Sequence, residues 1–204
     1  MDTSFTAPEI LLFTEQTPNP ESLKFVSNRI IYRGTADFKE DSAAREWSPL
    51  AASLFDLPYV KGVYITNNFV TITKEFNYEW AEIMLPLKEH IRVFLQEHPD
   101  AVIREGYAEA MQQLEASRIA EQFSGEEGAI ALRIKELIDT YVKPAVEMDG
   151  GNIEFKAWDN GTVYVTMQGS CSGCPSSTVT LKAGIEGMLK RMVPEVKEVV
   201  QEMG

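Results

Sequence analysis

The chain has 204 residues, 44% apolar and 25% charged, values typical of globular domains with a buried core. No apolar run reaches the roughly 18–20 residues that a membrane-spanning helix needs, so we expect no membrane partner. The formal net charge of −12 argues against nucleic acid as a partner, because phosphate binding requires clustered Lys and Arg.

The N-terminal segment, residues 1–9, contains acidic residues and no Lys or Arg. It is therefore typical neither of a secretory signal, which begins with basic residues, nor of an Arg-rich organelle presequence. From this composition we expect a cytoplasmic protein.

Residues 1–98 are predicted to form a compact mixed α/β domain. An apolar run at 10–13 is followed by two short strands expected at 23–26 and 30–32. Ser48 and Pro49 predict the start of a helix, because Ser caps helices and Pro suits the first helical position.

A β-hairpin and a long helix complete this first domain. The β-branched and aromatic segments 60–65 and 69–73 predict the two strands of the hairpin. Residues 77–98 are expected to be helical, because their apolar residues recur at helical spacing. This stripe consists of Trp80, Ile83, Leu87, Ile91 and Phe94.

Residues 99–128 are interpreted as a connection between two domains. The stretch is rich in Ala, Glu, Gln and Gly, and part of it, around 107–123, is predicted to be helical by propensity. The acidic, Gly-bounded piece at 124–128 is expected to be a flexible linker.

Residues 129–204 predict a second, smaller domain with the order α-β-β-α-β and a three-stranded sheet. A helical stripe precedes residues 149–151, whose glycines can end a helix. Asp159-Asn160-Gly161 is a strong hairpin turn between two alternating strands. A second amphipathic helix then ends at Pro194, and a last strand is expected at 195–201.

The chemistry of the chain is concentrated in residues 169–177, which contain both cysteines of the sequence, Cys171 and Cys174. A protein stabilised by disulfides uses more cysteines, spread along the chain. Two thiolates separated by two residues can instead bind one metal ion or two corners of a cluster. Gly173 permits a tight backbone, and Pro175 places Cys174 just ahead of a helix N-terminus, whose positive dipole end favours the thiolate.

The number of ligands decides between a monomeric and a dimeric site. A [4Fe–4S] cluster usually takes four cysteine thiolates, whereas one chain offers two. A symmetric dimer would supply all four from Cys171 and Cys174 of its two subunits. A cluster bound by a surface loop at such a subunit interface could be released again, as the function of a carrier requires.

The spacing alone leaves other interpretations open. A Cys-x-x-Cys pair also suits half of a Cys₄ zinc site in a zinc-bridged dimeric interaction scaffold, or a dithiol oxidoreductase, or two chemically inert cysteines. The oxidoreductase motif usually follows an early strand of a βαβ unit, whereas here the cysteines follow a hairpin near the C-terminus.

Two segments of the chain resemble known protein families, and each resemblance rests on several motifs that occur in a fixed order. The second domain is similar to the NifU-like C-terminal domain, and the first resembles the N-terminal domain of Nfu-type iron–sulfur scaffold proteins. The NifU marks are residues 143–151, 169–177, 180–182, 184–186 and 193–196, and the Nfu marks are residues 17–25, 48–51 and the hairpin strands 62–63 and 71–74.

The resemblance implies a carrier, not an enzyme, that receives a [4Fe–4S] cluster from an upstream donor and passes it to apo-proteins. Only Cys171 and Cys174 carry over as cluster and metal ligands, with one cluster per homodimer and a [2Fe–2S] form as the alternative. No catalytic residue is expected, since the sequence has no recognisable nucleophile–base pair or phosphate loop.

Two other features have ordinary structural interpretations. The Asp149-Gly150-Gly151 segment could shape the cluster loop, but we interpret it first as a helix-terminating turn. His90 and His98 are eight residues apart on one expected helix, and we expect them to face solvent rather than to bind a metal ion.

Overall fold

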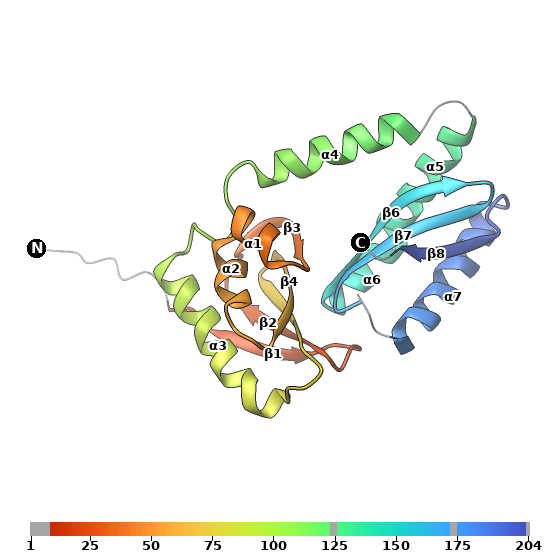
Figure 1. Ribbon diagram of the computed structural model, residues 1–204. Helices are drawn as coiled ribbons and strands as arrows, with labels where there is room; N and C mark the ends of the chain where they lie inside the picture. Colours follow the sequence, from red (N-terminus) through yellow and green to blue (C-terminus); the bar gives the residue numbers. More distant parts are fainter. Residues whose placement is uncertain (1–8, 123–125, 172–174, 203–204) are drawn as a thin grey trace, which may run out of the picture. The chain divides into compact units, whose positions relative to one another are not determined.

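The computed structural model describes residues 9–122, 126–171 and 175–202. The chain forms two compact units, one built mainly from Leu23–Tyr107 and the other mainly from Ala108–Gly204 (Figure 1). Each unit combines helices with its own β-sheet, which confirms the expected fold class of two small mixed α/β units. Among the described residues no helix is both long and apolar enough to span a bilayer.

The first unit is built on a five-stranded sheet with the order β1-β2-β5-β4-β3. The predicted hairpin is present as β4 and β5, which pair in antiparallel fashion, and Asn67 at its turn has a φ of 45°. The strands are β1 (Leu12–Gln16), β2 (Ser22–Ser27), β3 (Tyr32–Phe38), β4 (Val60–Asn67) and β5 (Phe69–Lys74).

The described residues of this unit also form the helices α1 (Asp41–Trp47), α2 (Pro49–Phe55) and α3 (Trp80–Glu97). Ser48 caps α2 as predicted, since its side chain accepts a hydrogen bond from the Ala51 amide at 3.0 Å. The expected stripe of α3 is largely confirmed, because Ile83, Leu87 and Ile91 are buried in the core. Helix α1 was not expected from the sequence.

The segment that follows α3 packs on the first unit rather than leaving it. The Ser48 hydroxyl donates a hydrogen bond to the Val102 carbonyl at 2.6 Å, and the Arg104 amide donates to the Trp47 carbonyl. The ring of Tyr107 contacts those of Tyr32, Phe38 and Trp47 at centroid distances of 6.4, 5.9 and 5.7 Å. The first nine residues of the expected connection are therefore held by the first unit.

The rest of the expected connection is largely helical. Helix α4 (Tyr107–Gln122) lies where a helix was predicted, and α5 (Glu126–Leu137) begins inside the acidic piece, so that residues 126–128 are helical. Residues 123–125 lie outside the described part of the chain, so the predicted flexibility of 124–128 stays a prediction there.

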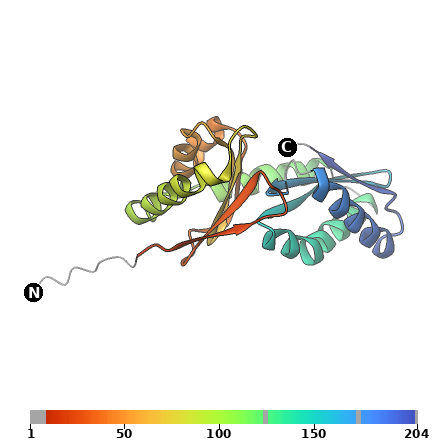
Figure 2. The same cartoon turned by 90° about the horizontal axis from the view of Figure 1, so that it is seen from below.

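The second unit has the predicted α-β-β-α-β order, with a sheet ordered β6-β7-β8 in which β7 and β8 are parallel. Figure 2 shows its helices, in teal and blue, on one side of the strands. Its elements after α5 are the π-helical turn η1 (Ile138–Val142), α6 (Lys143–Met148), β6 (Gly151–Asp159), β7 (Thr162–Gly169), α7 (Pro175–Met192) and β8 (Glu198–Glu202).

The π-helical turn η1 has a local cause in the sequence. Pro144 lacks the amide that would donate to the carbonyl four residues earlier, and its ring crowds that carbonyl. The Lys143 amide accordingly bonds the Ile138 carbonyl, five residues back. The widened turn lets one helical segment continue through Pro144 to Met148.

The hairpin of the second unit confirms the predicted turn. Asn160 and Gly161 have φ values of 48° and 99°, the positive angles that a two-residue hairpin turn requires. Ile153 and Phe155 on β6 and Val165 on β7 are buried on the helix-covered side of the sheet. This packing fixes the end of β7, where the cysteine segment begins.

Candidate functional site

Cys171 lies two residues beyond the end of β7 and is buried, with 5% of its surface exposed. It packs in the core cluster of the second unit. Cys174, the second predicted ligand, lies outside the described residues, and α7 begins directly after it at Pro175. The geometry of the site is therefore that of Cys171 and its surroundings.

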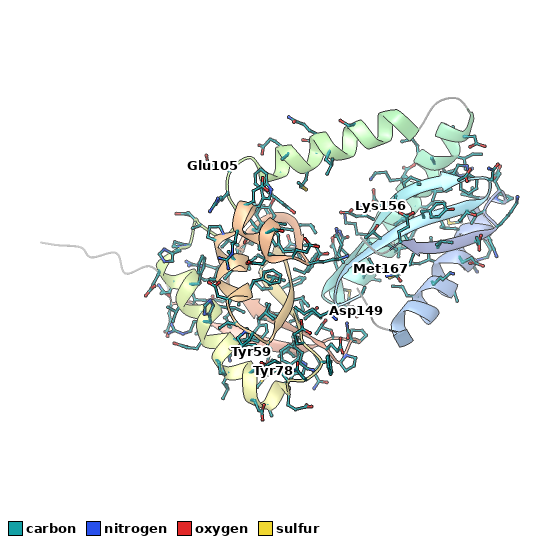
Figure 3. All side chains as sticks on the ribbon, viewed as in Figure 1. Tyr59, Tyr78, Glu105, Asp149, Lys156 and Met167 are labelled. Atoms are coloured by element: carbon teal, nitrogen blue, oxygen red, sulfur yellow. The ribbon has the colours of Figure 1, made fainter. Side chains whose placement is uncertain are left out.

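Ser170 ties the end of β7 to the turn that follows α6. Its hydroxyl donates a hydrogen bond to the Asp149 carbonyl at 2.6 Å, and its amide donates to the Gly150 carbonyl at 3.3 Å. The hydroxyl oxygen also lies 3.9 Å from the Cys171 sulfur. Figure 3 labels Asp149 at this turn and Met167 on β7. Since Ser170 is only 1% exposed, these bonds hold Cys171 against the turn in a water-poor environment.

Gly151, the first residue of β6, provides the space in which Cys171 sits. A Cβ atom at this position would lie 2.8 Å from the Cys171 sulfur and 3.1 Å from the Cys171 amide nitrogen. It would also lie 2.7 Å from the carbonyl oxygen of Gln168, across the β6–β7 ladder. No side chain fits there without moving the strand end or the cysteine.

The two glycines of the turn have different roles. Gly150 has a φ of 82°, and its amide bonds the Glu147 carbonyl at 3.0 Å, so the interpretation as a helix-terminating turn is confirmed. Gly151 contacts Cys171 directly, and this contact was only the second interpretation of the segment. The sequence feature that could have predicted this contact is the second glycine, Gly151, because a single glycine suffices to end a helix.

His90 differs from the sequence expectation. It is half-buried rather than facing solvent, and its Nε2 atom lies 2.9 Å from the Ser53 hydroxyl. Burial lowers the pKa of His90, and the negative charge of Asp56 opposes this shift. The Ser53 hydroxyl also donates a hydrogen bond to the Leu50 carbonyl at 2.8 Å, and the tautomer of His90 sets the direction of the hydrogen bond between His90 and Ser53.

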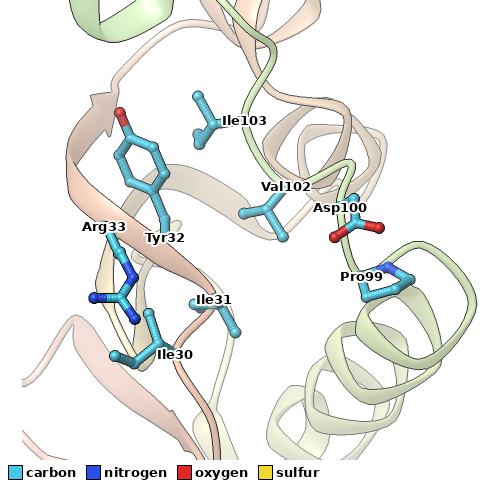
Figure 4. Close-up of a pocket in the computed structure, with 8 residues that line it drawn as sticks. All are labelled: Ile30, Ile31, Tyr32, Arg33, Pro99, Asp100, Val102 and Ile103. Atoms are coloured by element: carbon cyan, nitrogen blue, oxygen red, sulfur yellow. The ribbon is translucent and has the colours of Figure 1, made fainter. Parts of the chain in front are cut away.

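A hollow of about 310 Å³ lies in the first unit, between the β2–β3 connection and the segment after α3 (Figure 4). Its lining offers one guanidinium, on Arg33, and one carboxylate, on Asp100, among apolar and aromatic residues. Such a lining contains neither a nucleophile nor a cluster of metal ligands. Within the described residues, no group of three or more His, Cys, Asp or Glu side chains could hold a metal ion.

Comparison with known proteins assigns both units. A family model described as NifU-like domain matches residues 134–200, and one described as Scaffold protein Nfu/NifU N terminal matches residues 12–98. A curated relative from Drosophila persimilis is 38% identical, and the alignment covers 98% of this chain and 68% of the relative. The chain belongs to the Nfu family.

Other similar proteins support the assignment of this chain to the Nfu family. The relative from Drosophila willistoni is 41% identical over 92% of this chain and 62% of its own length, so the chain spans less than two thirds of that protein. Both relatives are named NFU1 iron-sulfur cluster scaffold homolog, mitochondrial. A solution structure of a NifU-like protein from Saccharomyces cerevisiae covers 50% of this chain and 92% of its own, at 24% identity and a TM-score of 0.44, which supports no conclusion about function.

The names of these relatives overturn the expected location. Three Drosophila relatives that are 38–41% identical to this chain are described as mitochondrial, so the prediction of a cytoplasmic protein is wrong. That prediction rested on nine N-terminal residues alone. Their acidic composition carries no information about how relatives of this chain are delivered to an organelle.

Proposed function

We propose that this Nfu-family chain is an iron–sulfur cluster carrier that holds one [4Fe–4S] cluster between two subunits and transfers it to apo-proteins. Cys171 and Cys174 of each subunit are the proposed ligands, with a [2Fe–2S] form as the alternative cargo. The observation that supports this most strongly is the position of Cys171 just after β7 and next to Gly151, where a Cβ atom would lie 2.8 Å from the Cys171 sulfur.

The chemistry of the donor set fits such a cargo. Thiolate sulfur is the usual ligand of iron–sulfur clusters, and four are needed where one chain has two. The 18-residue helix α7 begins immediately after Cys174, and the positive end of its dipole favours a thiolate at that position. Two chains in a symmetric dimer would complete the ligand set.

The burial of Cys171 implies how cargo is taken up. With 5% of its surface exposed, Cys171 cannot reach a cluster shared with a second subunit while its side chain points into the core. Loading therefore requires the thiol to turn outward, away from Gly151. A ligand that must turn outward to bind is suited to reversible loading and release.

The proposed domains keep the sequence-based division: residues 1–98, a connection at 99–128 and a cluster-binding domain at 129–204. The proposed partners are a second copy of the chain, an upstream cluster donor and apo iron–sulfur clients. The names of the relatives support work inside mitochondria. The proposed role is that of a carrier and not of an enzyme.

Anaerobic reconstitution with iron and sulfide tests the ligands. Wild-type protein should gain visible absorbance and bind about four iron and four sulfide per dimer. Cys171→Ala and Cys174→Ala should each abolish loading while the circular dichroism spectrum stays unchanged. Cluster binding that survives both substitutions would rule out these ligands.

The same preparation separates the rival functions. Stoichiometric zinc without visible absorbance would support a zinc-bridged interaction scaffold. Turnover of a disulfide substrate by the metal-free protein would support a dithiol oxidoreductase.

A further inference from the structure

An apolar stripe runs along the helical segment that leads to the cysteine site. Tyr141 and Met148 are 60% and 79% exposed, and Pro144 and Ala145 between them are exposed as well. Ile138, Val142 and Val146 of the same segment are buried, so the four exposed residues lie on its opposite, solvent-facing side. We call this set, Tyr141, Pro144, Ala145 and Met148, the η1–α6 stripe.

The stripe ends beside the proposed ligand. Met148 is followed by Asp149, whose carbonyl accepts the Ser170 hydrogen bond, and then by the turn to Gly151, which touches Cys171. Three residues span at most roughly 11 Å, so the Cα atom of Met148, at the end of the stripe, lies within that distance of the Cα atom of Gly151. Any second copy that brings its cysteines to the same cluster must approach the surface around Cys171.

The chemistry of the stripe suits contact with a second copy. Two chains that each carry a net charge of −12 repel one another, so their contact needs a patch without acidic groups, and the stripe has none. If two such helices pair in antiparallel fashion, Lys143 of one subunit lies at about the same height along the helix axis as Glu147 of the second copy. These two side chains carry opposite charges. Both features favour self-association over an acidic or polar client surface.

We infer that the η1–α6 stripe is the surface through which two copies of this chain pair when they share a cluster, an inference that rests on the proposed function. Burial of Tyr141 and Met148 in both subunits removes four large side chains from water. The stripe then joins the two subunits next to the cluster, and loss of the cluster leaves a contact too small to persist.

Charge substitutions test this surface. Tyr141→Glu combined with Met148→Glu should weaken cluster-dependent dimerisation roughly 100-fold, because each subunit loses two apolar contacts. The matched control is Leu132→Glu, an apolar residue of α5 in the same unit that is 56% exposed and lies outside the stripe. A milder pair, Tyr141→Ser with Met148→Ser, keeps the test informative if the Glu variant fails to fold.

Sedimentation analysis and iron content of anaerobically reconstituted protein provide the readout. The inference predicts loaded dimers for the wild type and Leu132→Glu, and unloaded monomers for both stripe variants. Stripe variants that load and dimerise like the wild type would overturn it. So would stripe variants that form loaded dimers but cannot pass the cluster to an apo-protein, because the stripe would then contact clients. A wild type that contains no iron, or keeps its cluster as a monomer, would instead reject the proposed function.

Discussion

Replacing Gly151 by Ala should destabilise the second unit and displace the Cys171 side chain from its buried position. The added methyl group would lie 2.7 Å from the Gln168 carbonyl oxygen, 2.8 Å from the Cys171 sulfur and 3.1 Å from the Cys171 amide nitrogen. Two of these three atoms are backbone, and Gly151 pairs with Gly169 in the β6–β7 ladder, so the strand end cannot simply move aside. Overpacking of this kind costs about 1–3 kcal/mol of unfolding free energy.

The matched control for this substitution is Gly187→Ala in α7. A Cβ at Gly187 would meet nothing within 4 Å, and Ala in a helix interior is about 0.5–1 kcal/mol more favourable than Gly. Hydrogen exchange of the β6 and β7 amides reports the stability of this unit, and the alkylation rate of Cys171 reports its position. We expect faster exchange and faster alkylation for Gly151→Ala alone. If both rates match the wild type, the close contact at Cys171 does not exist as described.

The remaining predictions concern Ser170, His90 and Tyr107. Ser170→Ala should lower the unfolding free energy by about 0.5–1.5 kcal/mol in a urea titration, because the hydrogen bond from the buried Ser170 hydroxyl to the Asp149 carbonyl is lost, and should raise the alkylation rate of Cys171. Burial lowers the pKa of His90 in the folded protein, whereas in the unfolded chain the pKa keeps its ordinary value of 6.5. As the pH drops below 6.5, the unfolded chain therefore binds more protons than the folded protein, and the free energy of unfolding should fall. His90→Gln should make the melting temperature depend less on pH between 5 and 7.5. A pH profile identical to that of the wild type would refute this role of His90. Tyr107→Ala should lower the melting temperature by removing about 3 kcal/mol of aromatic packing, without altering cluster loading.

Strong local patterns predicted most of the fold. The α3 stripe and the Asn160-Gly161 turn were recognisable because helical periodicity and hairpin turns are properties of neighbouring residues. Helix α1 was missed because Ala44 is its only buried residue, so no apolar period marks it. The packing of Tyr107 on the first unit was also missed, because the polar composition around it suggests a connection.

The candidate site was only partly predictable, because some of its contacts join residues that are distant in the sequence. Cys171 and Cys174 are recognisable by type and spacing, and the family resemblance gave them a role. The contacts of Gly151 with Cys171 and of Ser170 with Asp149 join residues about twenty positions apart. Such contacts depend on the register of the β6–β7 hairpin, which spacing alone does not specify.

Native mass spectrometry of oxygen-protected, reconstituted protein tests the central proposal most directly. The expected species is a dimer whose excess mass equals one [4Fe–4S] cluster, and it should separate into cluster-free monomers when the cluster is removed. A monomer that retains a complete cluster, or a dimer whose excess mass is zinc, would contradict the proposal that two chains share one iron–sulfur cargo.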